Sequence, residues 1–135
     1  MNSYYRIKRI FEDAWYNFRG RCQRFKRGYA YGDVWDMDQW FMRTVRLMLI
    51  HLRDHGNSFP MEFNTRDEWW SVLNEMINCL NFMDEDIARS FLGFGEIGDW
   101  KRMTEEDHKH VYKIMAENKI RFFELFSKYF YNLWD

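Results

Sequence analysis

The sequence predicts an all-α fold, a compact bundle of about four helices in a single domain over residues 1–135. Apolar residues recur at intervals of three and four positions along four stretches, which is the repeat of one helix face. Residues that break helices are scarce, since the chain has only one proline and seven glycines. This scarcity disfavours a sheet with many turns and suits long helices.

The first expected helix, residues 1–28, forms a basic head. Its apolar face runs from Ile7 to Phe18 at helical spacing, and Gly28 is placed to end it. Gly20 is a point at which this helix could divide into two pieces. The head is therefore expected to be one long helix or two shorter ones.

Charge is distributed unevenly, although the whole chain carries only −1. Residues 1–32 have a net charge of +6, residues 33–107 of −9 and residues 108–135 of +2. Arginine and aromatic side chains interleave in the head, a combination that can hold phosphates and stack on bases. The distribution indicates either attraction between the head and the acidic middle of its own fold, or a basic docking face.

Three further helices are expected, over residues 35–56, 65–90 and 104–134. Each begins with a capping residue followed three positions later by an acid or amide: Asp36 with Gln39, Thr65 with Glu68, and Thr104 with Asp107. We expect Gly56 to end the second helix in the left-handed conformation.

The chain ends on the aromatic stretch KYFYNLWD. Leu125, Tyr129 and Leu133 continue the apolar stripe of the last helix, so we expect this end to be docked helix. Three aromatic residues lie partly off that stripe: Phe130, Tyr131 and Trp134. These must face a second neighbour, either within the chain or from another molecule.

The segment HLRDH is a candidate metal site, because His51 and His55 would share one helix face with Asp54 between them. A metal-assisted hydrolase is one interpretation. The zinc-protease motif requires Glu directly after the first His, where this chain has Leu52. We favour a structural role, in which a cationic His55 is stabilised by the carboxyl end of its helix.

Other candidates for chemistry also have simpler interpretations. The acids of YGDVWDMD, Asp33, Asp36 and Asp38, lack the glycine and distal glutamate of a calcium loop, and helix capping accounts for Asp36. Cys22 and Cys79 are expected to be reduced thiols of a cytoplasmic protein. The sequence therefore predicts no catalytic residue, no cofactor and no metal, and no apolar run is long enough for a membrane span.

Residues 28–135 resemble a family of small bacteriophage proteins. The stretches that carry the resemblance are GYAYGDVWDMDQWFMRTVRLMLIHLRDHGNSFP, EWWSVLNEMI and LFSKYFYNLWD. The family pattern has Ser or Thr and then Pro after the YG, whereas here Gly32 is followed directly by Asp33. The resemblance implies a phage origin and brings no catalytic residues to this chain.

Thirteen Phe, eight Tyr and seven Trp exceed what a core of this size can hold, so some aromatic surface should remain exposed. Trp, Tyr and Arg are the residues that most often anchor interfaces. We expect a non-enzymatic phage protein that binds a host protein or complex, such as an inhibitor of a host defence system or CRISPR effector, in the host cytoplasm. The residues expected to bind the partner are Phe130, Tyr131, Trp134, Arg21, Arg24 and Arg27.

Nucleic acid and a second copy of the chain are two other possible partners. The alternative function is a nucleic-acid-binding accessory protein that uses the basic head. A homodimer is also compatible with the aromatic surplus. No membrane partner is expected.

Overall fold

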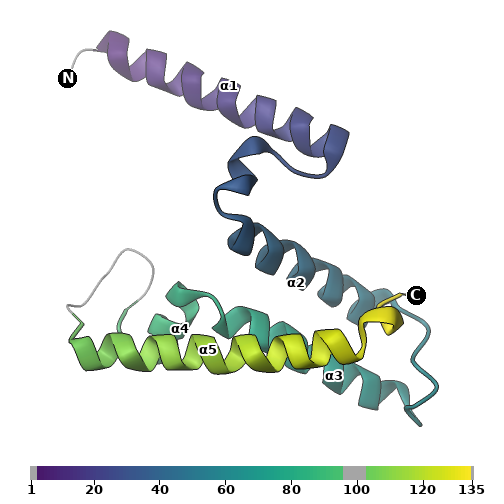
Figure 1. Ribbon diagram of the computed structural model, residues 1–135. Coiled ribbons are helices and arrows are strands. Elements are labelled where there is room, and N and C mark those ends of the chain that lie inside the picture. Colours follow the sequence, from purple (N-terminus) through teal and green to yellow (C-terminus); the bar gives the residue numbers. More distant parts are fainter. Residues whose placement is uncertain (1–2, 96–102, 135) are drawn as a thin grey trace. The chain divides into compact units, whose positions relative to one another are not determined.

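The computed structural model describes residues 3–95 and 103–134, which contain helices and no strand (Figure 1). The elements of these ranges are α1 (Ser3–Arg27), η1 (Tyr31–Val34), α2 (Met37–His55), α3 (Arg66–Phe82), α4 (Glu85–Phe91), α5 (Glu105–Lys128) and η2 (Phe130–Asn132), where η marks a short 3₁₀ helix. The all-α prediction is confirmed. The described ranges hold five α-helices where about four were expected.

The additional helix arises because the stretch expected to be one helix, residues 65–90, breaks at Met83 and Asp84. Asp84 has an extended backbone, and its Oδ1 accepts hydrogen bonds from the backbone N–H of Asp86 at 3.0 Å and of Ile87 at 3.2 Å. A carboxylate in this position is a strong N-cap, so a new helix begins at once. The last expected helix is also shorter than 104–134, since η2 follows the end of α5.

Contacts group the chain into two compact units, which are described separately. The N-terminal unit is residues 1–40, and the C-terminal unit is residues 41–135.

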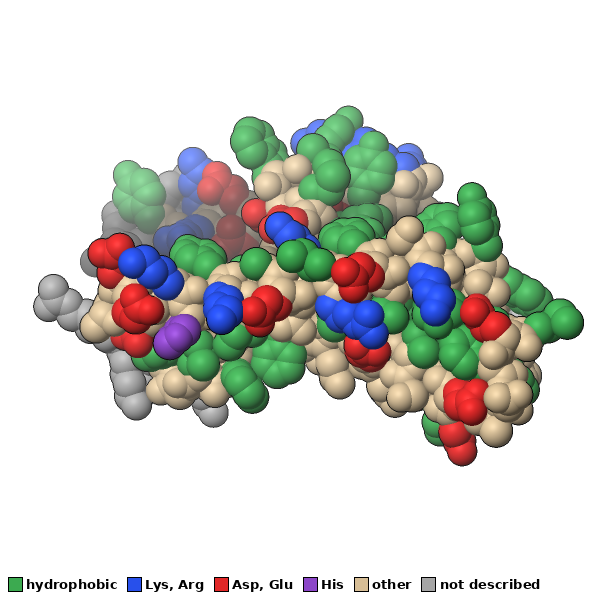
Figure 2. Space-filling model, turned by 60° about the horizontal axis from the view of Figure 1, so that its bottom comes forward, with side chains coloured by type: hydrophobic (Ala, Val, Ile, Leu, Met, Phe, Trp, Pro, Cys, Tyr) green, Lys and Arg blue, Asp and Glu red, His purple; other side chains and the backbone are tan. Residues whose placement is uncertain are grey.

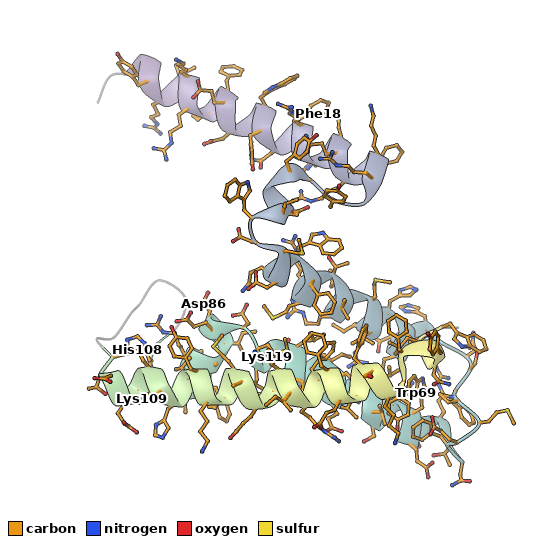
Figure 3. The ribbon with its side chains drawn as sticks, in the orientation of Figure 1. Phe18, Trp69, Asp86, His108, Lys109 and Lys119 are labelled. Atoms are coloured by element: carbon orange, nitrogen blue, oxygen red, sulfur yellow. The ribbon has the colours of Figure 1, made fainter. Side chains whose placement is uncertain are left out.

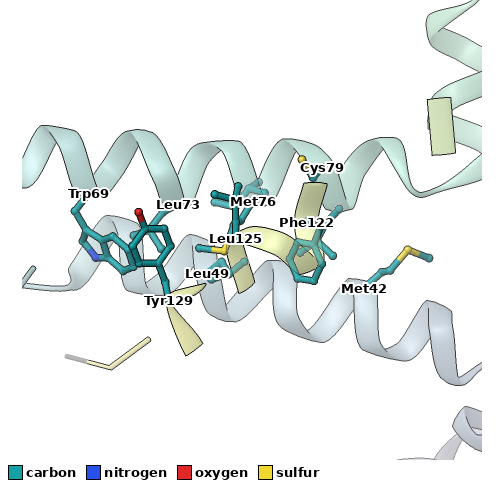
Figure 4. Close-up of a cluster of buried hydrophobic side chains, with 11 residues drawn as sticks. Met42, Leu49, Trp69, Leu73, Met76, Cys79, Phe122, Leu125 and Tyr129 are labelled. Carbon is teal, nitrogen blue, oxygen red and sulfur yellow. The ribbon is translucent and has the colours of Figure 1, made fainter. Parts of the chain in front are cut away.

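The C-terminal unit is built on α3 and α5, which lie side by side (Figure 1). Their facing stripes and two residues of α2 form the core drawn in Figure 4: Met42, Leu49, Trp69, Leu73, Met76, Ile77, Cys79, Leu80, Phe122, Leu125 and Tyr129. The residues that helical spacing places on the apolar face of the last expected helix are all buried or half-buried: Val111, Ile114, Met115, Asn118, Phe122, Leu125, Phe126, Tyr129 and Leu133. Burial of each large side chain stabilises the unit by about 1.5–3 kcal/mol.

The start of α5 is fixed by a complete capping box. The backbone N–H of Asp107 donates to Thr104 Oγ1 at 3.2 Å, and the backbone N–H of Thr104 donates to Asp107 Oδ2 at 2.8 Å. The N–H and hydroxyl of Thr104 hold the pKa of the Asp107 carboxyl below its ordinary value. The predicted start is confirmed, and Asp serves at the third position as Glu or Gln usually does.

The outer side of α5 carries opposite charges in alternation, with hydrophobic side chains between them on the face shown in Figure 2. Lys109 Nζ lies 3.3 Å from Glu105 Oε1, and Arg121 Nε lies 2.6 Å from Glu75 Oε1 on α3. Pairs exposed to solvent contribute little to stability. This side is therefore a solvated helix face.

Gly56 ends α2 as expected, but the predicted left-handed conformation is wrong, because its φ is not positive. Its N–H donates to the carbonyl oxygen of Leu52 at 2.8 Å, and a Cβ at this position would collide with that same oxygen. Glycine is required here by the close approach of backbone to backbone rather than by its φ angle.

The N-terminal unit consists of α1 and the turn that follows it. The helix continues without a break through Gly20 and stops at Gly28, whose φ of 80° is left-handed. The chain then folds back, and Arg24 donates to both carboxylate oxygens of Asp33, from Nε at 2.9 Å and from Nη2 at 2.6 Å. Asp33 Oδ2 also accepts from the backbone N–H of Ala30 at 2.8 Å, which holds the turn against the helix.

Candidate functional site

An apolar groove of about 610 Å³ lies on the C-terminal unit, between the second half of α2 and the end of the chain. Its lining is Val45, Leu47, Met48, Leu49, His51, Leu52, His55, Gly56, Phe126, Phe130 and Leu133. The bottom is formed by core residues such as Leu49, whereas Met48 on the wall is 65% exposed. Uncovered methionine and leucine beside a hollow are typical of surfaces that bind another molecule.

The three predicted C-terminal residues are exposed, and one of them lines this groove. Phe130 lines it and is 52% exposed, and its ring packs edge to face against Phe126 and Tyr131, with centroids 5.4 Å apart in each pair. Tyr131 is 89% exposed and Trp134 is 64% exposed. These three side chains are therefore accessible, as an interface role requires.

Tyr129 and Leu133 separate the accessible aromatic residues from the core. Tyr129 is buried against α3, where its ring lies 5.5 Å from that of Trp69, the labelled residue in the first turn of α3 in Figure 3. Leu133 is half-buried and packs against the same cluster. The end of the chain is thus docked, as predicted, although it is a 3₁₀ turn rather than a continuous helix.

The two histidines of HLRDH meet at the rim of the groove. Their rings stack with centroids 4.4 Å apart and planes 21° apart, and Nδ1 of His55 donates to the carbonyl oxygen of His51 at 3.2 Å. Metal–nitrogen bonds lie in the ring plane, so stacked rings direct their nitrogens in parallel rather than toward one ion. Asp54 is engaged by Arg53, whose hydrogen bonds lower the pKa of that carboxyl.

The acids of YGDVWDMD are likewise not gathered around a centre, since Asp33 holds Arg24 and the turn. In residues 3–95 and 103–134, no three His, Cys, Asp or Glu side chains form a group that could hold a metal ion. Cys79 is buried, and desolvation raises the pKa of its thiol, whereas Cys22 is exposed on α1.

The three arginines predicted to bind a partner have different surroundings. Arg24 pairs with Asp33, and the Arg27 guanidinium lies over the rings of Tyr29 and Tyr31, with its carbon 4.7 Å and 3.9 Å from their centroids. Both therefore contribute to the turn after α1, beside a cavity of about 340 Å³. Arg21 lies outside these contacts, and its role as a partner-binding residue stays a prediction.

Sequence reasoning missed the α2 wall of the groove. Its helical spacing places Met48 on the apolar face expected for residues 35–56, which predicts a core position, whereas the structure leaves it 65% exposed. The sequence does contain a sign of this wall. Positions 47–50 are all apolar, and four consecutive residues of a helix point to different sides, so they cannot all lie on one buried stripe.

Comparisons with family models, curated proteins and solved structures find no match for this chain. Across the described residues, none of the helices combines the length and apolar character needed to cross a membrane.

Proposed function

We propose that this protein is a non-enzymatic interaction module that binds a helix of a partner protein in the groove of its C-terminal unit. The observation that supports this most strongly is the open apolar groove lined by exposed Phe130, which is followed in the chain by exposed Tyr131 and Trp134. An amphipathic helix laid in a groove presents anchors at successive turns, and aromatic residues at the rim exclude water from such contacts.

The resemblance to small bacteriophage proteins favours a host protein as the partner. We therefore propose a host defence complex, for example a CRISPR effector, as the target in the host cytoplasm. A module of this kind acts by occupying a surface of the target, so the proposal includes no catalytic residue, cofactor, metal or membrane partner.

The test is capture of the partner from host lysate with matched variants. Trp134→Ala and Met48→Glu should each weaken binding at least 30-fold, on the scale of interface hot spots of about 2 kcal/mol. Tyr112→Ala removes another exposed aromatic side chain, on α5 outside the groove, and should leave binding unchanged.

Thermal unfolding of the same variants separates binding from folding. If Trp134→Ala strongly lowers the melting temperature while binding is unchanged, Trp134 closes the core of its own unit and the interface proposal fails for that residue.

Nucleic-acid binding through α1 is the second candidate, supported by the net charge of +6 on that helix. Cationic contacts to phosphates release counterions, so the affinity should fall steeply as salt increases. Titration with single- and double-stranded nucleic acid at low and moderate salt tests this candidate. Absence of binding at low salt would eliminate it.

A further inference from the structure

One side of α1 is apolar and uncovered within its unit. Between residues 5 and 27 the half-buried positions are Gly20 and Gln23, on the side that faces the returning turn. At 100° per residue, these two positions lie opposite Phe18, which is labelled in Figure 3. The turn after the helix thus packs on its polar side and leaves the apolar side free.

The uncovered side has a seven-residue repeat. Phe11, Phe18 and Phe25 are spaced seven apart, and all three are exposed, Phe25 to 92%. Ile7, Ala14 and Arg21 alternate with these phenylalanines along the helix, in steps of four and three. We call these six residues the α1 seam. A sustained heptad is the pattern of a helix that packs along another helix, rather than one that packs on a flat surface.

We propose that the α1 seam pairs with the same seam of a second copy of this chain, in antiparallel orientation. In an antiparallel pair, each phenylalanine of the seam in one copy faces one of the other three seam residues (Ile7, Ala14 or Arg21) in the second copy. Ala14 then lies opposite Phe18 of the second copy, so a small residue receives a large one. Phe25 likewise lies opposite Ile7 of the second copy.

In the third facing pair of the seam, the Arg21 guanidinium lies over the ring of Phe11 of the second copy, which is a favourable cation–π arrangement. In a parallel pair, by contrast, Arg21 would meet Arg21 of the second copy inside the seam. The one charged residue of the seam is therefore compatible with the antiparallel pair alone.

The charges along α1 favour the same orientation. Residues 3–15 have a net charge of +1, and residues 16–27 have a net charge of +5. Antiparallel pairing places the strongly cationic half beside the weakly cationic half and opposes the two helix dipoles, whereas parallel pairing places +5 beside +5. The repulsion that remains is screened by salt.

This repulsion predicts a salt dependence that identifies the occupant. Self-association should strengthen as salt increases, whereas binding of α1 to an acidic protein, a nucleic acid or an anionic lipid surface should weaken. The proposal does not depend on the groove of the C-terminal unit.

The first experiment measures the mass of the full chain by sedimentation equilibrium, up to about 100 µM because a seam of about three heptads should give a weak dimer. The dimer fraction should increase between about 0.05 M and about 0.5 M NaCl. Phe18→Asp should be monomeric, and Tyr131→Asp, a matched exposed aromatic in the other unit, should behave as the unmodified chain.

Two results would overturn the proposal: an unmodified chain that is monomeric at both salt concentrations, or a dimer that persists in Phe18→Asp. A chain that stays monomeric but binds anionic vesicles in a Phe18-dependent manner would show that the occupant is lipid and not a second copy.

The second experiment tests orientation with a short thiol-specific cross-linker. Antiparallel pairing brings residue 8 near the exposed Cys22 of the second copy, so Lys8→Cys should give a covalent dimer and the unmodified chain should not. Within one helix these positions are about 21 Å apart, beyond the reach of the reagent. Lys8→Cys with Cys22→Ser is the control and should not cross-link, whereas a Cys22–Cys22 product in the unmodified chain would indicate parallel pairing.

Discussion

The helices α1 and α5 are nearly equal in length, 25 and 24 residues, and both are amphipathic. They differ in whether the apolar stripe of the helix is buried. The apolar stripe of α5 supplies Val111, Phe122 and Leu125 to the core. The apolar stripe of α1 supplies no buried residue from position 5 to 27. A helical repeat therefore specifies which side of a helix is apolar, and a second packed element decides whether that side is buried.

The polar sides of the two helices also differ in what they contact. On α5 the polar side is solvated and carries exposed ion pairs. On α1 it holds the turn, through Arg24 and Asp33. The N-terminal unit is thus held by polar contacts, and the C-terminal unit by apolar ones.

The largest effect is expected where the apolar stripe is buried. Phe122→Ala empties a site that is 0% exposed and should lower the free energy of unfolding by about 3–5 kcal/mol. Urea unfolding followed by circular dichroism measures this loss. Phe123→Ala, one residue along and 46% exposed, is the control and should cost far less. Equal losses would mean that the two sides of α5 are packed alike.

Removal of the cap of α5 should have a smaller effect. Thr104→Ala deletes the oxygen that accepts from the N–H of Asp107 and should cost about 1 kcal/mol, the usual effect of losing an N-cap. Urea unfolding is again the measurement. Thr104→Ser keeps the oxygen and should recover most of the loss, whereas a serine variant as unstable as alanine would show that the methyl group is what matters.

The same cap predicts a dependence on pH. The pKa of Asp107 is lower in the folded state than its unfolded-state value of about 3.8. The ionised carboxylate therefore stabilises the fold fully above pH 3.8, and this contribution is lost as the pH falls through the folded-state pKa. The stability difference between the unmodified chain and Asp107→Asn should therefore be constant near pH 6 and shrink below pH 3.8. A difference that grows on acidification would contradict the sign of this shift.

A still smaller effect is expected on α1. Phe18→Ala removes an exposed ring and should change the free energy of unfolding by less than about 0.5 kcal/mol in dilute, monomeric protein. A loss comparable to that of Phe122→Ala would show that the α1 seam is packed within its own chain, and the contrast between the two helices would disappear.

The smallest global effect should come from Asp33→Asn, which weakens the contact between the turn and α1. The N–H of Ala30 donates to the Asp33 carboxylate, so its amide hydrogen should exchange faster in the variant. Amides in the middle of α1 should be unaffected, because their hydrogen bonds lie within the helix. Faster exchange along all of α1 would mean that the turn is needed for the helix to form.

Local signals in the sequence predicted the beginnings and ends of helices well. Thr65 and Thr104 cap α3 and α5, and Gly28 ends α1, because caps and left-handed glycines depend on neighbours within a few residues. The break at Asp84 was missed because a continuous apolar stripe conceals a new N-cap.

Only part of the candidate site could be predicted from the sequence. Phe130, Tyr131 and Trp134 lie off the apolar stripe expected for residues 104–134 and could be identified by spacing, and the structure leaves all three accessible. Met48 could not be identified, because its spacing matches a core residue and only the position of its neighbours leaves it on the wall of a groove.

The amino-acid sequence determined the all-helical fold, most helix boundaries and the apolar side of each helix, because these follow from the helical repeat and from hydrogen bonds across one turn. Tertiary structure decided which apolar sides became core and which remained surface. Burial depends on whether another element lies opposite, and contacts between distant segments are not encoded in the local spacing of residues.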